Sequence, residues 1–213
     1  MQIIGLIGSR GAGKTTAYNI ISRLMPTNEI MIARKLKTVC ADILCIPESD
    51  LNDPAVKEIP FEKPHILTPI DLEYILRKFD IYGHLPMAVA KHAGRGLKSP
   101  RDAAQYVGTE VVRDIDHQIH VKTAMRGAMD GILNVVTDIR FLNEYLAFSD
   151  AYPDFELWYI KRDVAEANAA ADTHPSERGI NLLRRYAGRV IENNGTIAGL
   201  QSAIRTAFTI PLR

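Results

Sequence analysis

The chain has 213 residues, of which 46% are hydrophobic and 24% are charged. These values are typical of a globular protein and exclude disordered and fibrous classes, and the length suits one domain with a sizeable insertion. Lys and Arg total 26 against 25 Asp and Glu, a net charge of +1. Because proteins that grip the nucleic-acid backbone usually carry a much larger basic excess, we expect no nucleic-acid partner.

The predicted elements alternate between short buried strands and helices. Apolar runs predict strands at residues 2–8, 28–33, 132–138, 155–161 and 189–192, and helical spacing predicts helices at 14–25, 34–44, 69–79, 84–93, 100–129 and 196–208. Four prolines interrupt the polar stretch 46–68, which predicts a mobile loop. Strands separated by helices predict a parallel sheet with helices on both faces.

The stretch between the second and third predicted strands is too long for a simple crossover, so we expect residues 46–130 to form an inserted helical subdomain. No apolar run reaches the length of a membrane-spanning helix. The first residues are apolar but lack the basic start and cleavage site of a signal peptide. We therefore expect a cytoplasmic protein with no membrane partner.

A phosphate-binding motif follows the first predicted strand. Residues 8–15 read G-S-R-G-A-G-K-T, which fits G-x-x-x-x-G-K-[ST] in full and opens a predicted helix. The glycines let backbone N–H groups turn toward a phosphate chain, Lys14 can reach the β- and γ-phosphates, and the Thr15 hydroxyl can ligate Mg²⁺. An ordinary glycine-rich turn is the alternative. We expect ATP or GTP binding, with Mg²⁺ as cofactor, at Gly8, Arg10, Gly11, Ala12, Gly13, Lys14, Thr15 and Thr16.

The third predicted strand ends in V-T-D-I-R, which places Asp138 and Arg140 at the carboxyl edge of the sheet, where α/β proteins bind ligands. Asp138 could hold the magnesium water shell and Arg140 could contact an acceptor phosphate. A helix cap with a local ion pair is the alternative for these two residues.

Basic residues at strand ends and helix starts favour phosphoryl transfer. Transfer requires mainly positioning and positive charge around the moving group. An acceptor that is itself a phosphate monoester is already anionic near neutral pH and needs no general base. The candidates are Arg95, Lys98, Arg101, Arg113, Arg140, Lys161, Arg162 and Arg178.

Several segments together resemble the deoxynucleoside monophosphate kinases of tailed bacteriophages, a branch of the P-loop nucleoside monophosphate kinases. The matching segments occur in the family's order over nearly the whole chain. They are L-K at 36–37, K-E at 57–58, S-P-R at 99–101, G-T-E at 108–110 with Arg113, D-I-R-F at 138–141 with N-E at 143–144, H-P-S-E at 174–177 and V-I-E-N-N-G at 190–195.

The resemblance implies transfer of the ATP γ-phosphate to a deoxynucleoside monophosphate (dNMP), which gives ADP and a deoxynucleoside diphosphate, in host cytoplasm if the chain is phage-encoded. It implies Lys14, Arg140 and Arg162 as catalytic residues, and Arg162, Asn193, Asn194 and Gly195 as further ATP contacts. It implies dNMP contacts at Lys37, Arg101, Arg113, Asp138 and Arg140, and a lid at residues 161–180.

The sequence thus predicts one P-loop kinase domain over residues 1–213, with a three-layer α/β/α fold, a five-stranded parallel sheet, the helical acceptor-binding insert and the lid. Two alternatives remain open: a kinase for another small acceptor, such as dephospho-coenzyme A, and a nucleotide-dependent switch or assembly protein. The sequence does not decide which bases are accepted or whether the chain forms a homodimer.

Overall fold

The computed structural model describes residues 1–170 and 175–209, without the side chains of residues 168–170 and 175–178. The chain divides into two compact units: the first joins Met1–Ile32 to Met125–Arg213, and the second is Ala33–Ala124. The second unit begins 13 residues before the expected start of the insert at residue 46 and ends before residue 130. It begins earlier because helix α2 (Arg34–Leu44) contributes Val39 and Cys40 to the same apolar core as the helices that follow.

The first unit contains a five-stranded sheet in the order β2-β5-β1-β6-β7. Its strands are β1 (Ile3–Ile7), β2 (Thr27–Ile30), β5 (Leu133–Val136), β6 (Glu156–Lys161) and β7 (Arg189–Glu192). Every pairing is parallel, so the carboxyl ends of all five strands lie along one edge. The parallel α/β sheet expected from the sequence is confirmed.

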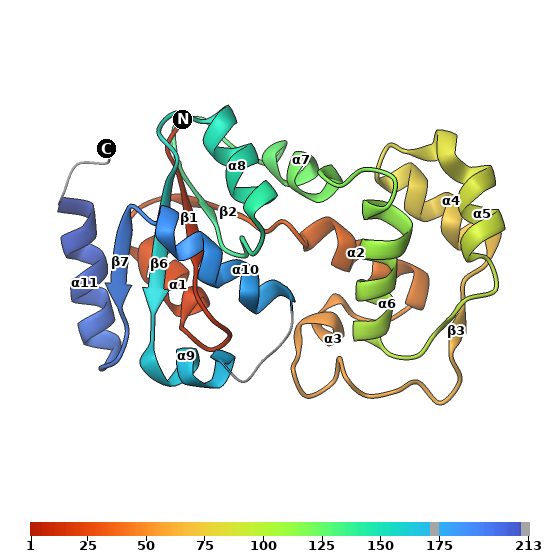
Figure 1. Cartoon of the computed structure of the whole chain (residues 1–213), viewed down its shortest axis with the longest axis horizontal. Helices are drawn as coiled ribbons and strands as arrows, with labels where there is room; N and C mark the ends of the chain where they lie inside the picture. The colour runs from red at the N-terminus through yellow and green to blue at the C-terminus, as the bar shows by residue number, and fades with distance from the viewer. Residues whose placement is uncertain (171–174, 210–213) are drawn as a thin grey trace. The chain divides into compact units, whose positions relative to one another are not determined.

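Helices cover both faces of this sheet (Figure 1). Helices α1 (Lys14–Leu24) and α11 (Ile197–Thr209) share one apolar cluster with β1 and β6. On the opposite face, Phe148 of α8 (Leu142–Ala151) stacks on Phe155 with the ring centroids 5.7 Å apart. The unit also contains α9 (Asp163–Ala170), α10 (Pro175–Leu183) and the 3-10 turn η3 (Arg184–Tyr186). β1 and β5 are buried along their whole length because they lie inside the sheet between two helical layers.

The second unit is mainly helical. Besides α2, its elements are α3 (Glu48–Asn52), β3 (His65–Ile66), α4 (Pro69–Lys78), η1 (Tyr82–His84), α5 (Leu85–His92), β4 (Gly96–Leu97), α6 (Pro100–Tyr106), η2 (Val107–Arg113) and α7 (Ile119–Met125). β3 and β4 form a small antiparallel pair. Among residues 1–170 and 175–209, no helix is long and apolar enough to cross a membrane.

Two local predictions are wrong. The single helix expected at residues 100–129 is divided into α6, the π-helix η2 and α7. Gly108 lies so close to Leu36 that an added Cβ would be 2.6 Å from that side chain, and the ring of His120 donates to the Gly108 carbonyl over 3.0 Å. The predicted loop 46–68 contains α3 and β3, and α8 was not expected at all.

Candidate active site

The backbone of the P-loop has a positive φ at three glycines, and two of them also leave no room for a Cβ. Gly8, Gly11 and Gly13 have φ values of 154°, 81° and 98°. A Cβ at Gly8 would lie 2.5 Å from the Ile160 carbonyl oxygen, and one at Gly13 would collide with the Asn193 side chain. The loop therefore packs directly against the end of β6 and against the turn that follows β7.

The loop leads into the N-terminus of α1. Gly13 is the N-cap residue, and the first intrahelical hydrogen bond runs from the Ala17 N–H to the Gly13 carbonyl over 2.8 Å. No side chain caps this end, and its first turn carries no acidic residue. The uncompensated positive end of the helix favours an anion. Thr15 is exposed there and Thr16 is half-buried, while Arg10 is exposed at the tip of the loop.

Lys14 folds back over the loop. Its ammonium donates to the carbonyl oxygens of Gly8, over 2.6 Å, and Ser9, over 3.2 Å. A phosphate group offers a charged acceptor in place of these neutral carbonyls, and hydrogen bonds between two charged groups are stronger. The side chain is thus anchored within the loop and can exchange its acceptors for phosphate oxygens.

The strand order brings the other predicted residues of the first unit to the same edge. β5 and β6 flank β1, so Asp138 and Arg140 follow one neighbour and Arg162 follows the other. The Arg162 guanidinium donates to the Gly11 carbonyl over 3.2 Å. The Asp138 carboxylate accepts the Ile32 N–H over 2.7 Å, which ties the end of β5 to the end of β2. The P-loop therefore lies between two loops that each carry an arginine.

A buried carboxylate that the sequence analysis missed holds the Arg140 loop. Glu144 is 4% exposed, and its Oε2 accepts the N–H groups of Arg140, over 2.9 Å, and Phe141, over 3.1 Å. The Arg140 side chain itself is exposed. The signal in the sequence is an acidic residue three positions after the N-cap residue Phe141, the position from which a side chain reaches back to the start of a helix.

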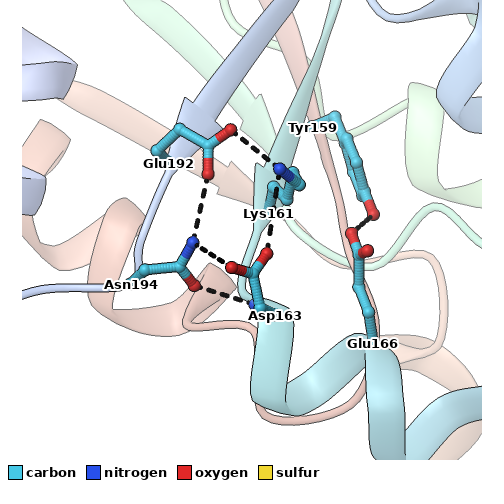
Figure 2. A network of polar contacts seen from close by, with 6 residues as sticks. All are labelled: Tyr159, Lys161, Asp163, Glu166, Glu192 and Asn194. Carbon is cyan, nitrogen blue, oxygen red and sulfur yellow. Dashed lines mark hydrogen bonds and ion pairs between the residues drawn. The ribbon is translucent and has the colours of Figure 1, made fainter.

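The turns after β6 and β7 are joined by the polar network of Figure 2. Asn194 donates to the Asp163 carboxylate over 2.9 Å and accepts the Asp163 N–H over 2.8 Å. The Lys161 ammonium lies 3.1 Å from Glu192 and 3.7 Å from Asp163. The hydrogen bond that Lys161 donates to Glu192, together with the charges of both carboxylates, raises the pKa of Lys161. Lys161, one of the cations expected to face phosphates, is therefore paired with carboxylates.

A second contact in Figure 2 ties α9 to β6. The Tyr159 hydroxyl donates to the Glu166 carboxylate. Burial and this hydrogen bond raise the pKa of Tyr159 to about 12. The phenol therefore stays protonated and keeps its donor at neutral pH, which fixes the first part of the expected lid to the sheet.

Three of the five expected acceptor contacts lie in the second unit, and the other two, Asp138 and Arg140, lie in the first. Lys37 on α2 donates to the Asn52 side chain over 2.6 Å, and Arg101 at the start of α6 forms an ion pair with Glu58. Arg113 ends η2 and is half-buried. Because α2 packs against α6 and η2, the three cations belong to neighbouring elements of one core. The Arg178 side chain and residues 171–174 of the expected lid lie outside the described residues.

The donor set at the sheet edge fits Mg²⁺. The Thr15 hydroxyl is exposed at the N-terminus of α1, and the Asp138 carboxylate follows the adjacent strand. Mg²⁺ prefers oxygen ligands and is commonly bound through one or two protein oxygens together with substrate phosphates and water. These residues supply that kind of oxygen beside the phosphate loop.

A curated protein and two solved structures resemble this chain over almost its whole length. No family model matches the chain. The chain is 26% identical over 219 residues to a protein of Acanthamoeba polyphaga mimivirus named "Putative deoxynucleotide monophosphate kinase", covering 96% of this chain and 94% of that protein. Among solved structures, TT1252 from Thermus thermophilus matches with a TM-score of 0.50 and 14% identity, covering 98% of this chain and 96% of that chain, a likeness of fold alone. A dephospho-CoA kinase from Campylobacter jejuni matches with a TM-score of 0.45 and 13% identity over the same shares of the two chains.

Proposed function

We propose that the chain is a kinase that transfers the γ-phosphate of ATP to a deoxynucleoside monophosphate. One observation carries the proposal: parallel strands deliver the P-loop, Arg140 and Arg162 to a single edge of the sheet. A phosphate loop flanked by two arginines suits a reaction in which negative charge spreads over a moving phosphoryl group. The full-length similarity to a protein named as a deoxynucleotide monophosphate kinase supports the acceptor class.

In the proposed reaction, an oxygen of the acceptor phosphate forms a bond to the γ-phosphorus while the bond from that phosphorus to the β-bridging oxygen breaks. The acceptor is already ionised near neutral pH, because the second pKa of a phosphate monoester is about 6. The chain therefore supplies no general base. Lys14 and the N–H groups at the start of α1 bind the β- and γ-phosphates. Arg140 and Arg162 neutralise the transferring group and hold it in line. Thr15 and, through water, Asp138 would hold Mg²⁺, whose positive charge would offset the negative charge of the nucleotide phosphates.

The acceptor side of the proposal rests on the second unit. Lys37, Arg101 and Arg113 are the proposed contacts for the monophosphate, and each is a cation on neighbouring elements of that unit. Arg101 is paired with the exposed carboxylate of Glu58. A dianionic phosphate is a stronger partner than a solvated carboxylate, so it would displace Glu58 from this arginine.

The test is ADP release from ATP and Mg²⁺ with each dNMP and each ribonucleoside monophosphate supplied in turn. We expect release that depends on a deoxynucleotide acceptor. In Arg140→Ala, we expect turnover to fall by about a hundredfold or more, since arginines that stabilise phosphoryl transfer contribute at least that much. ATP affinity should change little. Arg23→Ala is the matched control, because Arg23 is exposed in the last turn of α1, away from the P-loop.

Two results would refute the proposal. The first is intact ATP binding without ADP release for any nucleotide acceptor, which would favour the kinase of another acceptor or the switch protein. The second is full turnover in Arg140→Ala, which would remove the role given to the arginine after β5.

A further inference from the structure

The side chain of Asn193, near the C-terminal end of the chain, contacts the backbone of the P-loop. Asn193 follows β7, and its Nδ2 donates to the Ala12 carbonyl oxygen over 2.7 Å, across 181 positions of sequence. Its backbone N–H donates to the Lys161 carbonyl over 2.8 Å. A Cβ added at Gly13 would collide with the same Nδ2. The Asn193 amide thus fills the space that glycine leaves on one side of the loop.

This contact sets the orientation of one peptide group. A trans peptide is planar, and its C=O and N–H point in opposite directions. Because the Ala12 carbonyl points toward Asn193, the N–H of Gly13 in the same peptide points away from it. Gly13 caps α1, and the N–H groups at a helix N-terminus have no intrahelical partner. The side chain therefore turns this donor toward the open side of the loop.

The two chain neighbours of Asn193 belong to the polar network of Figure 2. Asn193 lies between Glu192, which is paired with Lys161, and Asn194, which forms two hydrogen bonds with Asp163. These contacts join the turns after β6 and β7 on both sides of the residue. Because these contacts already fix the backbone of Asn193, its hydrogen bond to the loop costs only the conformational entropy of the side chain.

From these contacts we propose that Asn193 is a positioning residue of the P-loop, which holds the Ala12–Gly13 peptide so that the Gly13 N–H faces the phosphates of a bound nucleotide. This role differs from the adenine contact expected from the sequence, since the amide is committed to the loop backbone. The inference rests on the proposed function only for the ligand, a nucleoside triphosphate, and it requires no particular acceptor.

Inorganic tripolyphosphate separates the two roles because it has phosphates and no base. We would titrate Asn193→Ala with tripolyphosphate and with ATP, both in the presence of Mg²⁺, by calorimetry. We expect both affinities to fall by a similar factor of about ten. This factor corresponds to the loss of roughly one hydrogen bond, because the variant lacks the Asn193 donor and the Gly13 N–H is then no longer held toward the phosphates. Asn193→Asp keeps the shape of the side chain but cannot donate, so it should fall at least as far. Asn19→Ala, an exposed asparagine on α1, is the matched control and should bind as the wild type does.

Two outcomes would overturn the proposal. Tripolyphosphate affinity that stays at the wild-type value while ATP affinity falls would assign Asn193 to the base, and wild-type affinity for both ligands would assign it no role in binding. A urea midpoint measured on each variant shows whether it is folded, and Asn193→Asp provides the answer if Asn193→Ala is not. Failure of the kinase proposal appears separately, as absent acceptor-dependent ADP release with phosphate binding still sensitive to Asn193.

Discussion

The buried ion pair between β6 and the edge strand β7 offers a quantitative test of the fold. Glu156 and Arg189 have side chains 10% and 9% exposed, and the Arg189 Nε lies 2.8 Å from the Glu156 Oε2. The same carboxylate oxygen accepts the Trp158 indole N–H over 2.8 Å, and the Arg189 Nη1 donates to the Ala207 carbonyl over 2.5 Å. The guanidinium also lies 5.6 Å from the centre of the Trp158 ring.

Removing one partner leaves the other charge buried without its counter-ion. For Arg189→Met, which keeps much of the apolar volume, we expect the free energy of unfolding to fall by about 3–5 kcal/mol. This is a large share of the roughly 5–15 kcal/mol that holds a typical domain folded. In the double variant Glu156→Gln with Arg189→Met, the glutamine still accepts the indole N–H of Trp158 and no charge remains. The double variant should therefore be more stable than the sum of the single changes predicts, by about 1–3 kcal/mol.

Urea unfolding followed by tryptophan fluorescence measures these values. Trp158 is the single tryptophan of the chain and is fully buried, so its emission reports the first unit. Far-UV circular dichroism, which sees both units, tests whether they unfold together. If Arg189→Met lowered stability by less than about 1 kcal/mol and the two changes were additive, the buried pair would not have the role assigned to it.

Two further predictions concern other buried groups. Glu144→Ala removes the acceptor of two backbone N–H groups, so it should lower the free energy of unfolding by about 2–4 kcal/mol and also reduce turnover by loosening the Arg140 loop. Glu144→Gln keeps one acceptor oxygen and should recover part of the stability and part of the turnover. Equal losses in the two variants would contradict this reasoning. Burial and the charge of Lys91 lower the pKa of His92, whose ring lies 3.0 Å from the Tyr106 hydroxyl. Because the unfolded chain then binds the proton more readily than the folded chain, stability should fall as pH drops through about 6.5. The urea midpoint of His92→Gln should depend less on pH across that range.

The elements of the fold follow largely from apolar patterning. The strands at residues 2–8 and 189–192 are continuous apolar or alternating runs, and the structure places β1 and β7 there. The helix predicted at 34–44 coincides with α2. The sequence did not predict the division of the 100–129 helix, in whose π-helical part Gly108 lies against Leu36 of another helix. Such a contact leaves no periodic signal in the local sequence.

The candidate site was predictable in its parts and not in its connections. The motif at residues 8–15 identifies the P-loop because its glycine spacing reflects a backbone requirement. The pairing of Lys161 with Glu192 could not be predicted, because Glu192 lies 31 positions away and faces Lys161 only through the parallel register of β6 and β7. The same pairing of β6 and β7 brings Asn193 next to the P-loop. Charge at a strand end therefore indicates a site, while the pairing of strands decides which charges face a ligand.

The P-loop is held by donors that differ in their freedom to move. Arg162 and Asn193, from the turns after β6 and β7, donate to the carbonyls of Gly11 and Ala12. Their contacts turn carbonyl oxygens, which would repel a phosphate, toward the protein. Lys14 satisfies carbonyls of the same loop from a long flexible side chain. If a phosphate draws the Lys14 ammonium away, the carbonyls of Gly8 and Ser9 lose this donor, and the Ala12–Gly13 peptide keeps the orientation that Asn193 imposes.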